Sequence, residues 1–120
     1  MIGEISGAAK IYLVAGRTDM RKNIDGLSGI ISRTYGLDPF SNAIFLFCGK
    51  RCDRIKILYY EKTGFVLYYK VLDNGRFQWP RDKSEARMIT RQQFRWLMDG
   101  ISIDQPKAIQ QVPRDTRRDL

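Results

Sequence analysis

Residues 53–80 read DRIKILYYEKTGFVLYYKVLDNGRFQWP. Three strand-length runs, rich in β-branched and aromatic residues, are separated here by tight-turn residues, first Glu61–Gly64 and then Asp73–Gly75, the strongest hairpin signal in the chain. This pattern predicts an antiparallel meander with strands at 54–60, 65–71 and 76–79. Cationic side chains recur among the aromatic ones along the meander, so its surface suits an anionic polymer.

The residues before the meander predict a strand and a helix. Lys10–Val14 is short and β-branched, which is typical of an opening strand. Thr18 is expected to cap a helix that runs to about Thr34, because apolar residues then recur at steps of three and four. These residues are Met20, Ile24, Leu27, Ile30 and Ile31. Gly26 and Gly29 lie inside this helix, where we expect a neighbouring strand or helix to pack closely.

Three further signals complete the predicted elements. Ala43–Cys48 is apolar at every position, which indicates a core strand that is either central in its sheet or covered on both sides. A charged hairpin tip, Lys50–Asp53, joins that strand to the meander. Pro80 cannot donate to a ladder, so the sheet is expected to end there. Thr90 and Gln93 form a capping-box pattern at the start of a short second helix.

These elements predict a single α+β domain with an antiparallel sheet of about five strands. The longer helix is expected to pack on one face of the sheet, and the short helix that starts at Thr90 near an edge. The chain has 120 residues, of which 43% are hydrophobic and 28% charged, values that suit one domain with one core. We expect this domain over residues 1–105 and a loosely held polar tail over residues 106–120.

The composition excludes several kinds of active site. The chain has no histidine and no Walker-type loop, so Ser/His/Asp, Cys/His and phosphate-loop chemistry are excluded. Cys48 and Cys52 cannot complete a four-ligand zinc site without histidine, so we expect two reduced thiols and neither a metal nor a cofactor. The acidic residues fall mainly at predicted turns and caps: Asp19, Asp25, Asp38, Asp53, Glu61, Asp73, Asp82 and Glu85. We therefore expect no enzymatic activity and assign no catalytic residue.

The charge balance makes nucleic acid the first partner to consider. The 21 Lys and Arg residues exceed the 13 Asp and Glu residues by a formal charge of +8, which attracts polyanions. The candidate phosphate contacts lie on the meander and beside it: Arg17, Arg21, Lys22, Lys50, Arg51, Arg54, Lys56, Lys70 and Arg76. The aromatic residues of the meander either fill the core or form an exposed surface that stacks on bases or binds a protein. Tyr60, Tyr68 and Trp79 are the candidates for such a partner-binding surface.

Ordered blocks over about residues 8–105 resemble one known family. They are Thr18–Gly26, Asp38-Pro-Phe40, Asp53–Tyr60, Tyr69-Lys70 and Gly75–Pro80. The chain resembles the small accessory protein TnpB, which is encoded by the second open reading frame of insertion sequence 66 type mobile elements. The resemblance implies a role in DNA transposition in bacteria, beside a separate, larger transposase that carries the acidic catalytic residues.

We therefore expect a non-catalytic transposition accessory protein that binds the DNA ends of the element or the complex of transposase and DNA. The alternative is an adaptor that binds the transposase, or another element-encoded accessory protein, through its aromatic face without contacting DNA. No apolar run approaches the roughly 20 residues of a membrane span, and no signal-peptide pattern is present. We expect a cytoplasmic protein without membrane contact, with nucleoid association and self-association left open.

Overall fold

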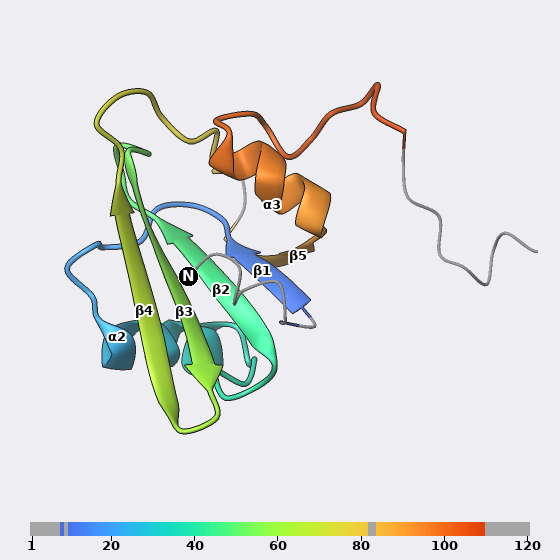
Figure 1. Cartoon of the computed structure of the whole chain (residues 1–120). Coiled ribbons are helices and arrows are strands. Elements are labelled where there is room, and N and C mark those ends of the chain that lie inside the picture. Colours follow the sequence, from blue (N-terminus) through green and yellow to red (C-terminus); the bar gives the residue numbers. More distant parts are fainter. Residues whose placement is uncertain (1–7, 9, 82–83, 110–120) are drawn as a thin grey trace, which may run out of the picture.

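The centre of the fold is a five-stranded sheet with the spatial order β4-β3-β2-β1-β5 (Figure 1). The computed structural model describes residues 8, 10–81 and 84–109. The strands are β1 (Lys10–Val14), β2 (Ala43–Cys48), β3 (Arg54–Glu61), β4 (Gly64–Val71) and β5 (Ala86–Ile89). The helices are α2 (Ile24–Gly29), which continues as the π-helical segment η1 (Ile30–Thr34), and α3 (Arg91–Met98). The α+β prediction is confirmed, whereas most of the predicted tail lies outside the described residues.

Strands β2, β3 and β4 form an antiparallel meander, in which β3 and β4 correspond to the first two strands of the predicted one. The register places Leu46 opposite Ile57, and Ile57 opposite Tyr68. Strand β1 instead runs parallel to β2, with Leu13 opposite Leu46. A parallel pair needs a crossover between its strands, and here α2 and η1 supply it. The sheet is therefore mixed, with one parallel pair among antiparallel ones.

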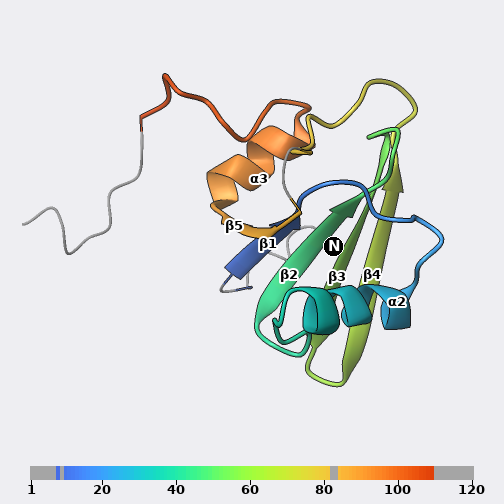
Figure 2. The ribbon, with the colours of Figure 1, turned by 180° about the vertical axis from the view of Figure 1, so that it is seen from behind.

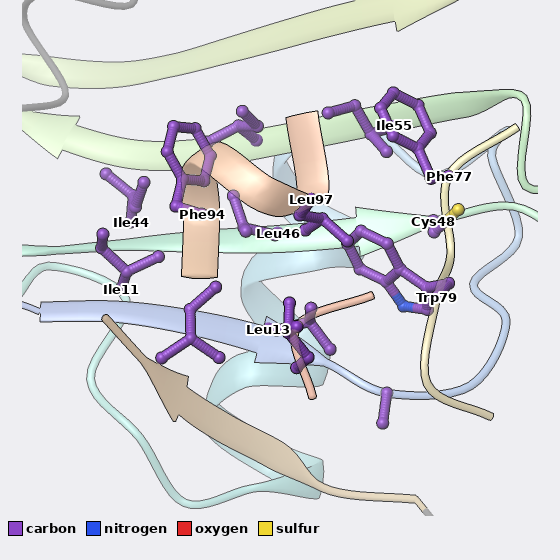
Figure 3. Packing of buried hydrophobic residues seen from close by; sticks show 14 of the residues in the cluster. Ile11, Leu13, Ile44, Leu46, Cys48, Ile55, Phe77, Trp79, Phe94 and Leu97 are labelled. Carbon is purple, nitrogen blue, oxygen red and sulfur yellow. The ribbon is translucent and has the colours of Figure 1, made fainter. Parts of the chain in front are cut away.

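Each face of the sheet packs against one helix (Figure 2, Figure 3). Leu27 of α2 and Ile31 of η1 are fully buried against one face, in a cluster with Phe45. Phe94 and Leu97 of α3 are buried against the opposite face. We call these the α2 face and the α3 face. Every residue of β2 is buried between them, which confirms the prediction that this strand lies in the core.

The first helix begins later than predicted. Asn23, not Thr18, precedes the first helical residue, and it makes no capping bond through its side chain. Thr18 is buried in the loop, and its backbone N–H donates to the carbonyl of Cys48 over 2.8 Å. The loop is thus tied to the end of β2, which keeps the residues around Thr18 out of the helix.

The close packing expected at two helical glycines has a different source from the one predicted. A Cβ atom added to Gly26 would lie 3.1 Å from the Cβ of Lys22. One added to Gly29 would overlap the guanidinium of Arg33. Both neighbours belong to the same stretch of chain, so no other strand or helix accounts for these glycines.

The chain after β4 does not form the predicted hairpin strand. Gly75 does adopt a left-handed turn conformation, with φ of 81°. Phe77 and Trp79 then enter the α3-face core, where they are only 3% and 6% exposed. The Phe77 N–H donates to the Cys52 carbonyl over 2.8 Å, and the Trp79 indole Nε1 donates to the Val14 carbonyl over 2.9 Å. The burial of these two large rings stabilises the fold more than the backbone hydrogen bonds of an additional strand beside β4 would. The fifth strand is β5, which the sequence did not predict.

The second helix begins as predicted. The Gln93 N–H donates to the Thr90 hydroxyl over 3.0 Å, and the Thr90 N–H donates to the Gln93 side chain over 2.8 Å. Both bonds of the capping box are therefore present. Helix α3 follows the edge strand β5 directly, and it packs over the α3 face of the sheet.

Candidate nucleic-acid interface

Two loops lie beside one another at one end of the sheet (Figure 2). One is the hairpin tip between β2 and β3, residues 49–53, and the other is the loop between β1 and α2, residues 15–23. They line a hollow of about 480 Å³, and an adjoining hollow of about 360 Å³ shares residues 17–19 with it. We call this region the basic end; it comprises Arg17, Arg21, Lys22, Lys50, Arg51, Arg54 and Arg81, with the carboxylates Asp19 and Asp53.

The two loops of the basic end pack directly on each other. A Cβ atom added to Gly49 would lie 2.7 Å from the Cγ of Met20, so the absence of a side chain allows this approach. The Nη2 of Arg81 donates to the carbonyls of Gly49 and Lys50, over 2.9 and 2.8 Å, and it lies 2.7 Å from the sulfur of Cys52. Arg81 therefore holds the hairpin tip in place.

Arg81 was not among the residues that the sequence predicted for this site. For this part of the chain the sequence predicts only that the sheet ends at Pro80. The carbonyl of Gly49 that Arg81 contacts lies 32 residues away in sequence. No local spacing could have indicated that contact.

Two arginines of the basic end form ion pairs with its two carboxylates. The Arg21 guanidinium donates through Nε to Oδ1 of Asp19, over 3.1 Å, and through Nη2 to Oδ2, over 2.8 Å. These side-chain bonds, followed by the bond from the Arg21 backbone N–H, lower the pKa of Asp19 from 3.8 to about 2. Asp53 pairs more loosely with Arg54, with 3.2 Å between Nε and Oδ1. Asp19 and Asp53 thus each have an arginine partner within the basic end.

The other cations leave this end of the molecule positively charged. Arg17, Lys50 and Arg51 form no ion pair within the described part of the chain, and all three are exposed. Basic residues outnumber carboxylates here by seven to two, so a polyanion would meet a local excess of positive charge.

The structure brings six of the nine predicted phosphate-contacting residues into the basic end: Arg17, Arg21, Lys22, Lys50, Arg51 and Arg54. Lys70 and Arg76 are exposed elsewhere. Lys70 lies opposite Ile55, whose side chain belongs to the α3-face core, so Lys70 points to that face. Arg76 lies in the segment after β4. Neither residue lines the two hollows.

Lys56 is not part of an exposed platform, contrary to the prediction. Only 5% of Lys56 is exposed, because α2 and the loop before it cover its face of β3. Its ammonium donates to the Lys22 carbonyl over 2.8 Å and to Oδ1 of Asn23 over 3.2 Å. The same ammonium lies 5.0 Å from the centre of the Tyr69 ring. Its contacts are thus internal, and they position the start of α2.

The three predicted partner-binding rings do not form one surface. Trp79 is buried, so its prediction as a surface residue is wrong. Tyr68 is half-buried and packs against the α3-face core. Tyr60 packs with Phe40 and Phe65, and the ring centroids of these three residues lie 5.0 to 5.1 Å apart. We call these three residues the ring trio; they lie at the opposite end of β3 from the basic end.

Another exposed ring lies beside the basic end. Tyr69 is 47% exposed, and its hydroxyl accepts a hydrogen bond from Nη1 of Arg54 over 3.3 Å. Tyr69 was not among the predicted site residues. Tyr69 lies opposite Lys56, and Arg54 lies opposite Val71, two residues further along β4. Because side chains alternate along a strand, Tyr69 and Arg54 are on the same face, the α2 face. An exposed ring with an adjacent guanidinium offers a base a stacking surface beside a phosphate contact.

The described residues contain no group of three or more His, Cys, Asp or Glu side chains placed to bind a metal ion. No helix among them is long and apolar enough to cross a membrane.

Comparison with known proteins relates the chain to a family of mobile-element proteins. The family model described as "IS66 Orf2 like protein" matches residues 9–108. An uncharacterized protein y4jC of Sinorhizobium fredii (strain NBRC 101917 / NGR234) is 32% identical over 101 residues, which cover 84% of this chain and 86% of that protein. A second from the same strain, y4hO, is 30% identical over 98 residues, covering 82% and 85%. No solved structure matches the chain.

Proposed function

Because the chain belongs to the IS66 Orf2-like family, we propose that it is a non-catalytic accessory protein that binds element-end DNA during transposition. The family membership supports an accessory role in transposition. In this proposal, bond breaking falls to a separate transposase. The proposed DNA contact is the basic end. In this proposal the protein acts in the bacterial cytoplasm, at the nucleoid, together with the transposase.

The observation that carries this proposal is the convergence of cations from separate parts of the sequence. Arg17 comes from the loop after β1, Lys50 and Arg51 from the hairpin tip, and Arg81 from the segment after β4. Packing of Gly49 on Met20 and the bonds of Arg81 hold these segments together in the folded protein. A preformed cationic surface loses little conformational entropy when it binds a phosphate backbone.

The proposed contacts divide by chemistry. Arg17, Lys50 and Arg51, which have no carboxylate partner in the described part of the chain, would contact phosphates directly. Arg81 would position the tip, since its guanidinium already donates to two backbone carbonyls there. Tyr69 would stack on an unpaired or distorted base at the rim.

Fluorescence anisotropy with labelled element-end DNA tests this proposal. The triple variant Arg17→Gln, Lys50→Gln, Arg51→Gln is expected to bind more weakly and to lower the slope of log K against log salt by about 0.9 for each phosphate that it no longer neutralises. The matched control is Lys10→Gln, Arg95→Gln, Lys107→Gln, which removes three exposed charges outside the basic end. Equal weakening in the two variants, or no salt-dependent binding by the unsubstituted protein, would contradict a specific role for the basic end.

A second candidate function is an adaptor that binds the transposase without contacting DNA. The ring trio supports it, because Phe40 is 60% exposed although it packs on Tyr60 and Phe65. Large exposed rings are typical of protein interfaces. Capture by the transposase after nuclease treatment, abolished in Phe40→Ala and kept in the triple charge variant, would favour the adaptor.

A further inference from the structure

The outer side of β4 is an open edge of the sheet. Strand β4 pairs with β3 on one side, and no other described strand pairs with it. It is eight residues long, Gly64–Val71, whereas the opposite edge strand β5 has four. Long edge strands in soluble proteins are usually interrupted by proline, by a bulge or by several charges. Strand β4 has no proline, and Lys70 is its only charged residue.

The direction of the backbone groups on this edge follows from one hydrogen bond. The N–H of Leu72 donates to the carbonyl of Asp53 over 2.7 Å, so Leu72 directs its polar backbone groups toward β3. These directions alternate along a strand. The N–H and C=O groups of Phe65, Leu67, Tyr69 and Val71 therefore point away from β3, toward the open edge.

The same alternate residues form an apolar stripe on the α2 face. Tyr69 and Val71 are 47% and 46% exposed. At the other end of the strand, the ring of Phe65 packs against the ring of Phe40, which is 60% exposed. Tyr69 and Val71 of β4, together with Phe40, which packs on Phe65 of the same strand, are thus three exposed large hydrophobic residues on the α2 face. Exposed apolar groups beside unpaired backbone groups are typical of strands that associate.

We propose that two copies of this chain pair through their β4 strands, antiparallel about a two-fold axis at Tyr68, to form one continuous sheet. This register places Phe65 opposite Val71 of the second copy and Leu67 opposite its Tyr69. All four outward-directed residues then take part in the ladder. Each ring trio covers the exposed end of the other copy's strand.

The charge pattern favours a second copy as the occupant of this edge. Lys70 lies opposite Val66 of the second copy, so no two like charges face each other. An alternative axis at Leu67 would place Phe65 opposite Tyr69 and leave Val71 unpaired. Because the strands are antiparallel, the two basic ends lie at opposite ends of the paired strands, where their mutual repulsion is weak.

Disulfide trapping tests the register. In a Cys52→Ser background, Tyr68→Cys puts two thiols directly opposite each other across the axis, in a pair without mutual backbone hydrogen bonds, where Cα atoms lie about 4.5 Å apart. Diamide is expected to convert this variant to a covalent dimer. Val66→Cys in the same background is the matched control, because its two copies would lie about four residues, roughly 13 Å, apart. Equal cross-linking of the two variants, or none, would overturn the proposed register.

Sedimentation equilibrium tests the interface itself. The unsubstituted protein is expected to dimerise, and Val71→Glu to weaken the association by about tenfold or more, because it buries a carboxylate against Phe65. Met88→Glu is the control, since Met88 is 58% exposed on the opposite edge strand. Circular dichroism checks that both variants are folded. A monomer at every concentration, or equal weakening by the two substitutions, would overturn the proposal.

Salt separates this proposal from DNA binding. The interface consists of backbone hydrogen bonds and apolar side chains, so high salt is expected to preserve the dimer while it abolishes DNA binding. Dissociation of the dimer at high salt would contradict the interface. A dimer that does not bind DNA would contradict only the proposed function.

Discussion

The ammonium of Lys56 lies 2.8 Å from the backbone carbonyl oxygen of Lys22 and donates a hydrogen bond to it. A second bond, of 3.2 Å, reaches Oδ1 of Asn23, which precedes α2. Strand β3 is thereby tied to the loop that carries the cations of the basic end. The lysine at the centre of the meander thus serves the architecture of the proposed site.

Replacement of Lys56 by methionine is expected to lower the free energy of unfolding by about 1–3 kcal/mol, because the Lys22 carbonyl loses its buried donor. Urea unfolding measures this change. Lys50→Met is the control, since Lys50 is an exposed lysine of the hairpin tip and its replacement should change stability by less than about 0.5 kcal/mol. Equal stability of the two variants would contradict the internal role of Lys56.

Trp79→Phe is expected to destabilise the fold by about 1–3 kcal/mol, since it leaves the Val14 carbonyl without the indole donor. Trp79→Ala should cost about 3–5 kcal/mol, because it also opens a cavity between the sheet and α3. Thermal unfolding followed by circular dichroism provides the measurement. Trp96→Phe should cost less, because Trp96 is half-buried and its indole makes no hydrogen bond within the described residues.

The Asp19 carboxylate is expected to titrate with a pKa of about 2, well below its ordinary value of 3.8. Because the folded-state pKa is lowered, the bond to Arg21 contributes stability above the unfolded-state pKa, and this contribution is lost as the pH falls from about 4 to about 2. Carboxyl NMR titration measures the pKa, and Arg21→Gln should return it toward 3.8. The pair is exposed, so added salt should shrink the shift. An unchanged pKa in Arg21→Gln would contradict this pairing.

The two cysteines are expected to differ strongly in reactivity. Burial, followed by the nearby Cys52 sulfur, raises the pKa of Cys48 to about 12. Cys48 is fully buried, whereas Cys52 is partly exposed at the hairpin tip. Iodoacetamide at a pH of about 8 should therefore modify the accessible Cys52 in the folded protein and Cys48 only after unfolding. Mass spectrometry detects both products, and Cys52→Ser should take up no label until it is denatured.

Much of the fold follows from local patterns. The unbroken apolar run of β2 predicts burial on both faces, and each of its residues is buried. The spacing of Thr90 and Gln93 predicts the start of α3, because the capping box involves only residues three positions apart. Along β3, strict alternation places Ile55 and Ile57 in the core on the α3 face and Leu58 in the core on the α2 face.

The errors arise where a distant contact outweighs a local signal. Asp73–Gly75 is a good hairpin turn, yet Phe77 and Trp79 leave the sheet to fill the space under α3. Thr18 is a good helix cap, yet its backbone pairs with Cys48. In both cases the competing interaction joins residues about 25 or more positions apart.

The order of residues alone determined that this chain is a basic α+β protein with a buried central strand, and it indicated the family. Charge, alternation and turn chemistry are local properties that need no coordinates. Only the tertiary structure decided which cations share a surface. In the folded protein Arg17, Lys50, Arg51 and Arg81 lie together at one end of the sheet, whereas Lys56 and Trp79 are buried. Exposure depends on what the rest of the chain packs against, and burial of large side chains between a sheet and its helices is a property of the whole fold.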